Sequence, residues 1–323
     1  TAFVPMFLLS QHVRTEGVKV VLSGEGADEI FLGYDIFKEA RLRAEWNRLN
    51  QAQRRQRIRG LYPYLPHFTE ANLRVLEANY ARSIGAVTDP LFSHASRFAN
   101  GGFALRLLRT REGALDSLLS ALPNFEEQSP VRKAQWIEFH TLLQGYLLSS
   151  QGDRMAFAHG VEPRCPFLSS EVVAYAAQLP ERYLLSAQDD EKHLIKHAFR
   201  ANLPLKITSK PKQPYRAPDA AALRAPENSE RFYPWVEDLL CEQNLRDIGP
   251  LDSEEALRFI AKLRRTPRES ISPREDQAFI LLLSLVVLDQ QFIRRLGVPS
   301  PSKRPPLVRT VDLTAEQSST QKS

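Results

Sequence analysis

The sequence predicts an α/β chain that is mostly helical, and three observations lead to this prediction. A short apolar run at residues 18–22 ends in a turn of small residues, which is typical of a strand that lies in a sheet. Longer segments rich in Ala, Glu, Arg and Leu follow, and these residues favour helices. Prolines separate many of the segments and mark where helices end. We therefore expect a small sheet beside many helices.

The expected elements follow one another along the chain. The apolar run predicts a buried strand, formed by Val18, Val20, Val21 and Leu22. A helix should begin near Asp28 and Glu29. Composition and apolar periodicity predict further helices at residues 37–59, 70–84, 104–122, 136–148, 171–179, 192–200 and 275–296. Four prolines in residues 203–218 favour a structured loop, and the Pro-, Ser- and Thr-rich residues 298–323 predict a disordered tail.

Composition excludes several classes of protein. The net charge of +5 over 323 residues is modest and its basic residues are spread out, which argues against nucleic-acid binding. Cys165 and Cys241 lack paired-ligand spacing, so neither a disulfide framework nor a zinc site is indicated, and a reducing cytoplasm is the expected location. No apolar run reaches the roughly 18 residues of a membrane span, and residues 278–288 fit a buried helix.

The turn after the predicted strand combines small residues with carboxylates. Ser23 and Gly24 let a ligand approach the main chain closely, at the strand end where α/β sheets bind ligands. Glu25, Asp28 and Glu29 supply oxygens of the kind that Mg²⁺ prefers, together with phosphate oxygens. The alternative is an ordinary glycine turn whose acids stabilise the start of a helix.

Charged residues form a second group, in residues 151–168. They are Asp153, Arg154, Glu162 and Arg164. Arginines beside carboxylates can orient a carboxylate or phosphate substrate through forked hydrogen bonds. The same charges can instead form a structural lattice of ion pairs between two helices.

Two further charged segments follow. Lys210 and Lys212 lie in a proline-stiffened loop, where a lysine can meet a phosphate group or simply be solvated. Residues 189–192 are most simply the charged start of a helix.

Four segments together resemble the synthetase domain of glutamine-dependent asparagine synthetases. They are VVLSGEGADEIFLGY at 20–34, LLSSQGDRMAFAHGVEPRCPFL at 147–168, EKHLIK at 191–196 and KPKQPYRAP at 210–218. Their order and approximate spacing also fit. The resemblance implies a partial adenine-nucleotide alpha-hydrolase-like (ATP-pyrophosphatase) domain over residues 1–297.

The resemblance also implies a reaction and its participants. ATP and Mg²⁺ would serve to adenylate the side-chain carboxylate of aspartate, and ammonia from glutamine would then displace AMP to give asparagine. Ser23 and Gly24 match the contacts to the nucleotide, and Asp28 matches the Mg²⁺ ligand. Glu25 matches the acid of the ammonia step, and Lys212 matches the lysine that stabilises phosphate charge during adenylation.

The sequence departs from the family pattern in several places. The Ser-Gly-Gly-x-Asp-Ser loop and the glutaminase domain are absent, so we expect a fragment that is inactive without that region, and a homodimer is compatible with it. Leu32 replaces a usual glycine, Pro163 and Ser169 replace a usual Ala or Gly and Asp, and Lys210 replaces an arginine.

These departures leave the identity of the acceptor open. A related amide-forming synthetase of secondary metabolism is one alternative, although Glu25 argues against the β-lactam branch, which carries tyrosine there. A non-catalytic helical protein derived from the enzyme is the other alternative.

Overall fold

The computed structural model describes residues 2–61, 69–82, 91–110, 124–210, 212, 219–225 and 230–294. Within these residues the sheet consists of two parallel strands, β1 (Val20–Leu22) and β2 (Glu162–Arg164). Val20 pairs with Glu162 and Leu22 with Arg164. The predicted strand is therefore confirmed, whereas β2 lies in a segment that its charges had marked only as a candidate site.

The predicted burial of residues 18–22 is wrong for Val18, Val20 and Leu22, whereas Val21 is partly buried. Val18 is 43% exposed, Val20 42% and Leu22 77%. A strand in a parallel sheet is buried when helices cover both of its faces. Here β1 pairs with a single described strand, and α1 (Phe3–Thr15), a helix that the sequence analysis missed, packs mainly on α9 (Arg154–Phe157) and on the π-helix η5 (Glu138–Asp153).

The single helix expected at 37–59 is interrupted. The chain forms α3 (Asp35–Glu45), a short 3₁₀ turn at Trp46–Arg48, and then α4 (Gln51–Leu61). Asn50 caps the start of α4. Its side-chain oxygen accepts from the backbone N–H of Gln53 at 2.9 Å, and the side-chain oxygen of Gln53 accepts from the backbone N–H of Asn50 at 2.9 Å. Local capping therefore overrides the high helix propensity of the segment.

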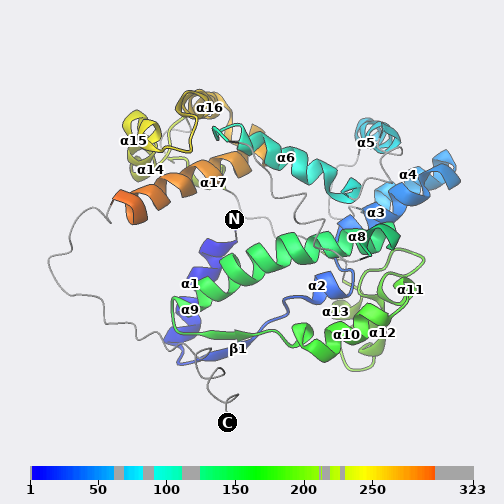
Figure 1. Cartoon of the computed structure of the whole chain (residues 1–323). Helices are drawn as coiled ribbons and strands as arrows, with labels where there is room; N and C mark the ends of the chain where they lie inside the picture. The colour runs from blue at the N-terminus through cyan, green and yellow to red at the C-terminus, as the bar shows by residue number, and fades with distance from the viewer. Residues whose placement is uncertain are drawn as a thin grey trace, which may run out of the picture.

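A long helical rod runs across the middle of the molecule (Figure 1). It consists of α8 (Pro130–Ile137), η5 and α9. The helix expected at 136–148 is confirmed and forms the middle of this rod. Its π-helical geometry was not foreseen, because sequence periodicity does not distinguish a π-helix from an α-helix. The rod contacts α3 and also α2 (Ala27–Ile30), the short helix that the sequence predicted at Asp28.

A separate group of helices lies above the rod in Figure 1. Its members are α6 (Ala95–Leu105), α14 (Pro234–Leu239), α15 (Glu242–Asp247), α16 (Ser253–Arg265) and α17 (Pro273–Leu288). Of the helix expected at 104–122, Ala104 and Leu105 are the end of α6, which covers the aromatic segment before it, and residues 106–110 are not helical. Residues 111–123 lie outside the described residues. Elsewhere in the chain, α5 (Glu70–Arg82) confirms the helix expected at 70–84.

The apolar helix α17 forms the centre of this upper group. Phe279 and Leu282 are fully buried in one hydrophobic cluster with residues of α6, α14 and α16. The segment Pro273–Arg294, which includes the short π-helix η9 (Asp289–Arg294), is long and apolar enough to cross a membrane. This is weak evidence for a membrane span, because a buried core helix passes the same test. The expected burial holds for one face only, since Phe292 is 61% exposed.

In the last part of the fold, α10 (Ser170–Gln178) contacts α2 and the 3₁₀ turn at Pro166–Leu168. This part also contains α11 (Glu181–Leu184), α12 (His193–Ala198) and α13 (Leu205–Thr208). The helices expected at 171–179 and 192–200 are thereby confirmed, and Cys165 and Cys241 are both free thiols. The structured loop expected at 203–218 contains a short helix that the sequence did not predict, α13. Residues 211 and 213–218 of that loop and the whole predicted tail 298–323 lie outside the described residues.

Candidate functional site

The turn that follows β1 is tied to the end of β2 by the main chain. The backbone N–H of Ser23 donates to the carbonyl of Arg164 at 2.8 Å. The Ser23 hydroxyl accepts from the N–H of Glu25 at 3.3 Å, which closes the turn. A Cβ added at Gly24 would meet nothing within 4 Å. There is therefore open space beside Gly24, at the carboxyl ends of both strands, where α/β sheets bind ligands.

Gly26 fixes the direction in which α2 leaves this turn. Its φ of +87° lies in the left-handed region that favours glycine. A Cβ at this position would also lie 2.3 Å from Leu168 Cδ2. Both constraints require glycine, so the turn and α2 have a defined orientation relative to the 3₁₀ turn Pro166–Leu168 that follows β2.

Asp28 is the centre of the charged cluster. Its Oδ1 lies 2.8 Å from Lys192 Nζ, and its Oδ2 lies 2.7 Å from Lys212 Nζ. Gly33 allows this arrangement, since a Cβ there would lie 2.0 Å from Asp28 Oδ1 and 2.6 Å from Lys192 Cε. Two ammonium groups share the Asp28 carboxylate, and the Glu25 carboxylate is close enough to interact with both Asp28 and Lys212. The ammonium groups can meet phosphate as point charges.

A second carboxylate, Glu191, organises the lysines. It is 4% exposed, and its Oε2 lies 2.7 Å from Lys38 Nζ while its Oε1 lies 2.8 Å from Lys196 Nζ. Oε1 also accepts from the backbone N–H of Lys212 at 2.9 Å. Burial alone would raise the pKa of Glu191, but the hydrogen bonds from Lys196 and Lys38 outweigh it and lower the pKa to about 2. Glu191 is therefore an ionised anchor that holds Lys212 beside Asp28.

Two other carboxylates, Glu25 in the turn and Glu29 in α2, have raised pKa values. Burial, then the charge of Asp28, raises the pKa of Glu25, while Lys212 opposes the change. Burial raises the pKa of Glu29 to about 7, although Glu29 accepts a hydrogen bond of 2.7 Å from the Tyr34 hydroxyl. Glu25 interacts electrostatically with Lys212, and its pKa is raised above the usual value for a glutamate. A raised pKa suits a carboxylate that accepts a proton. Glu29 is 1% exposed and serves the packing of α2.

The structure separates the four charges predicted near residues 153–164. Asp153 and Glu25 both act on Cys165, whose pKa is raised first by burial and then by these two carboxylates. Glu162 pairs with Arg164 at 2.9 Å on the exposed surface of β2. Together with Arg154 all four side chains are exposed, so a buried lattice of ion pairs between two helices is not what these residues form. Of the four, Asp153 is the one that the structure connects electrostatically with the turn.

The site contains residues that sequence reasoning missed. Glu191 and Lys192 were interpreted as a helix start, yet α12 begins only at His193 and Lys192 adopts a left-handed φ of +52°. Their presence in the segment EKHLIK was the available signal. Leu32, which stands where the resemblance leads us to expect glycine, has a φ of +54° and is fully buried. The backbone thus keeps the conformation that glycine adopts easily, at a cost of about 1 kcal/mol or more.

The donor set bears on whether a metal ion fits. Within the described residues, no group of three or more His, Cys, Asp or Glu side chains could hold an ion by itself. Mg²⁺ characteristically uses one or two carboxylates and completes its shell with waters and substrate phosphates. Asp28 offers one such carboxylate, and the ammonium groups of Lys192 and Lys212 beside it can bind phosphate oxygens instead. The residues fit an ion that arrives with a phosphorylated ligand.

Comparison with known proteins adds independent findings. The family described as asparagine synthase matches residues 1–286. A Mycobacterium tuberculosis protein that is provisionally named as a glutamine-hydrolysing asparagine synthetase is 30% identical over 238 residues, covering 73% of this chain and 35% of its own. Amidase chry2 of Gibberella zeae is 25% identical over 265 residues, covering 76% of this chain and 38% of its own.

A third relative comes from a bacterium. Glutamine-hydrolysing asparagine synthetase 1 of Bacillus subtilis is 22% identical over 247 residues, covering 75% of this chain and 36% of its own. The chain therefore spans little more than a third of the length of the curated relatives it matches. No solved structure matches it.

Proposed function

The chain belongs to the asparagine synthase family, and on that premise we propose that it carries an activating site for ATP-dependent amide synthesis. The proposed substrate is the side-chain carboxylate of aspartate, and the proposed cofactors are ATP and Mg²⁺. The observation that carries the proposal is the contact between Asp28 and Lys212, 184 positions apart in the sequence. It joins two of the four family-like segments into one charged site.

In the proposed first step, an oxygen of the substrate carboxylate attacks the α-phosphorus of ATP. The new bond is an acyl phosphate, and the bond to pyrophosphate breaks. Negative charge develops on the α-phosphate and on the leaving group, and fixed cations stabilise it. Lys212 is proposed for this role because Glu191 holds its backbone and Asp28 holds its ammonium. Ser23 and Gly24 would contact the nucleotide at the open turn.

In the proposed second step, ammonia derived from glutamine attacks the acyl carbon and AMP leaves. The nitrogen must lose a proton as the adduct forms and collapses. Glu25 is proposed to accept it, since burial and the charge of Asp28 raise its pKa and make it a better base. Bound Mg²⁺, held through Asp28, would neutralise phosphate charge.

Isotope exchange tests the two steps separately. With the natural protein that carries this chain, we expect aspartate-dependent exchange of labelled pyrophosphate into ATP. Lys212→Met should reduce that exchange by about 100-fold or more, the range typical of a lost electrostatic group. Glu25→Gln should retain much of the exchange and lose amide formation. Lys206→Met, which changes an exposed lysine of α13, is the matched control and should behave as wild type.

Two results would contradict the proposal. One is the formation of ADP in place of AMP. The other is pyrophosphate exchange that survives Lys212→Met at the level of Lys206→Met. The isolated 323-residue chain is expected to bind ATP weakly and to lack synthetase activity, and calorimetry that finds micromolar binding of ATP with Mg²⁺ would refute this expectation.

A second candidate keeps the chemistry and changes the acceptor. The match to Amidase chry2 and the replacements at Leu32, Pro163, Ser169 and Lys210 favour it. A panel of carboxylic acids in the exchange assay separates the two candidates, since the true acceptor is the acid that stimulates exchange most strongly.

A further inference from the structure

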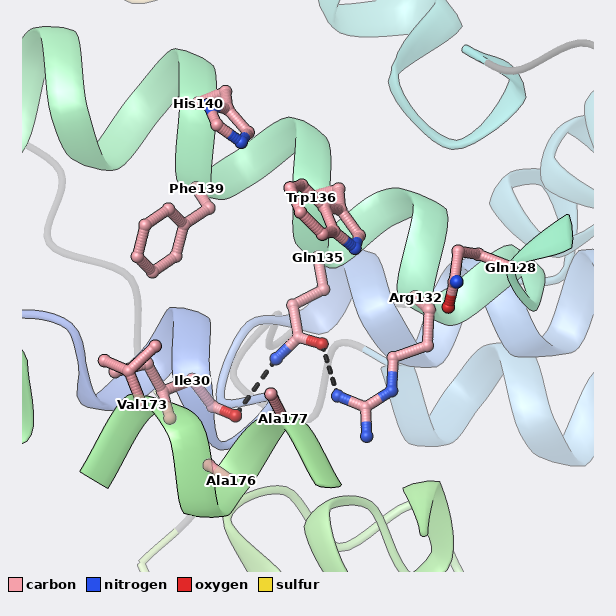
Figure 2. Close-up of a pocket in the computed structure, with 10 residues that line it drawn as sticks. All are labelled: Ile30, Gln128, Arg132, Gln135, Trp136, Phe139, His140, Val173, Ala176 and Ala177. Atoms are coloured by element: carbon pink, nitrogen blue, oxygen red, sulfur yellow. Dashed lines mark hydrogen bonds between the residues drawn. The ribbon is translucent and has the colours of Figure 1, made fainter. Parts of the chain in front are cut away.

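A cavity of about 480 Å³ lies between α8 and α10, next to α2 (Figure 2). Aromatic rings from α8 and the start of η5 form one wall: Trp136, Phe139 and His140. Small side chains of α10 form the facing wall: Val173, Ala176 and Ala177. The lining therefore combines aromatic rings with short aliphatic side chains, and the volume is large enough for a small aromatic ring. The proposed synthetase reaction uses none of these residues.

The aromatic wall is uncharged at neutral pH. The rings of Trp136 and His140 are stacked, with centroids 5.4 Å apart and planes 9° from parallel. Burial lowers the pKa of His140, which keeps its imidazole neutral at pH 7. A planar apolar ring gains contact area and stacking on such a wall.

One cation, Arg132, lines the same cavity. Its NH2 donates to the carbonyl of Leu179 at 2.6 Å, and its NH1 donates to Gln135 Oε1 at 2.6 Å. A guanidinium has five N–H donors, so three remain after these two bonds. Within the described residues, no carboxylate oxygen lies within 4.0 Å of an Arg132 nitrogen.

The carboxylate that acts on Arg132 from a distance is Glu181. Its oxygens are engaged elsewhere, because Oε2 accepts from the Ser129 hydroxyl at 2.8 Å and Oε1 lies 3.9 Å from Arg41 Nε. A half-buried guanidinium at an apolar cavity therefore has donors to offer to an anion from outside the described residues.

We propose that this cavity binds a planar aromatic carboxylic acid in its anionic form. The ring lies between the aromatic wall and α10, and the carboxylate accepts hydrogen bonds from Arg132. This site is separate from the cluster around Asp28 and does not depend on the proposed synthetase reaction.

The cavity is also mechanically connected to α2. Gln135, which lines it, donates from Nε2 to the carbonyl of Ile30 at 3.0 Å (Figure 2). The same Nε2 donates to the carbonyl of Glu29 at 2.8 Å. Arg132 fixes the orientation of that amide. Arg132 and Gln135 thus form a hydrogen-bonded connection between the cavity and the main chain of α2.

Fluorescence titration with 1-naphthoate tests the proposal. We expect the naphthoate anion to bind wild-type protein at least about tenfold more tightly than the cation 1-naphthylmethylammonium, a difference equal to one good charge contact. Ala177→Trp fills the cavity and should weaken naphthoate binding by about tenfold or more. Ala174→Trp, at an exposed position of the same helix outside the cavity lining, is the matched control and should bind as wild type.

Arg132→Gln provides an independent test that does not fill the cavity. The Arg132→Gln protein should still bind both naphthalene probes, but it should no longer bind 1-naphthoate more tightly than 1-naphthylmethylammonium. Circular dichroism checks that each variant is folded. Equal binding of the two probes to wild-type protein, or unchanged naphthoate binding by folded Ala177→Trp and Arg132→Gln proteins, would overturn the proposal.

Discussion

Replacing Glu191 with glutamine should destabilise the protein strongly, because this carboxylate neutralises buried ammonium groups. The pKa of Glu191 is about 2 in the folded chain against 4.5 for a free side chain. At about 1.4 kcal/mol per pKa unit, this difference corresponds to about 3 kcal/mol of stability. Because the folded pKa is lowered, that stability is present above pH 4.5 and is lost as the pH falls through 2.

The structural cause is visible at Lys38. Its side chain is 6% exposed, and without the charge of Glu191 its remaining carboxylate contact is Asp35 at 3.4 Å. A buried charge that loses its partner typically costs about 3–5 kcal/mol, and the amide of glutamine restores part of the hydrogen bonding. We therefore expect a loss of about 2–3 kcal/mol for Glu191→Gln at pH 7.

Urea unfolding at pH 7, followed by circular dichroism, measures this loss. Glu16→Gln, at an exposed position after α1, is the matched control and should change stability by less than about 0.5 kcal/mol. The fall in stability of Glu191→Gln relative to wild type should shrink as the pH is lowered toward 3. A Glu191→Gln protein that unfolds within about 0.5 kcal/mol of wild type at pH 7 would refute the assignment of Glu191 as the electrostatic anchor.

Three further predictions concern α2 and its supports. The pKa of Glu29 is about 7 in the folded protein, so wild type should lose stability as the pH rises from 4.5 through 7. Glu29→Gln should remove this loss, and urea unfolding at pH 8 should find the variant more stable than wild type by up to about 3 kcal/mol. A Cβ at Gly33 collides with Asp28, so Gly33→Ala should lower stability by about 1–3 kcal/mol, whereas Gly60→Ala, in open space on α4, should not; equal thermal midpoints would contradict this. Gln135→Leu removes two donors to carbonyls of α2 and should cost about 1–3 kcal/mol with faster amide exchange there; unchanged exchange would count against the support role.

Local pattern was sufficient for the parts of this chain whose structure depends on near neighbours. The strand Val20–Leu22, the turn from Ser23 and the short helix Ala27–Ile30 all appear where the residues predicted them. Helix periodicity also located α5, α10 and α12. It failed where capping at Asn50 interrupted a helical composition and where η5 adopted π-helical geometry.

The sequence by itself determined which residue types are present for chemistry: a small-residue turn with Glu25 and Asp28, and a lysine loop with Lys212. Only the tertiary structure decided that Asp28 meets Lys212 and that Glu191 anchors it. It also decided that Val20 and Leu22, which share one face of β1, are exposed. The reason is physical: helix capping and side-chain periodicity act over a few residues, whereas ion pairing and burial depend on which distant segments the folded chain brings together.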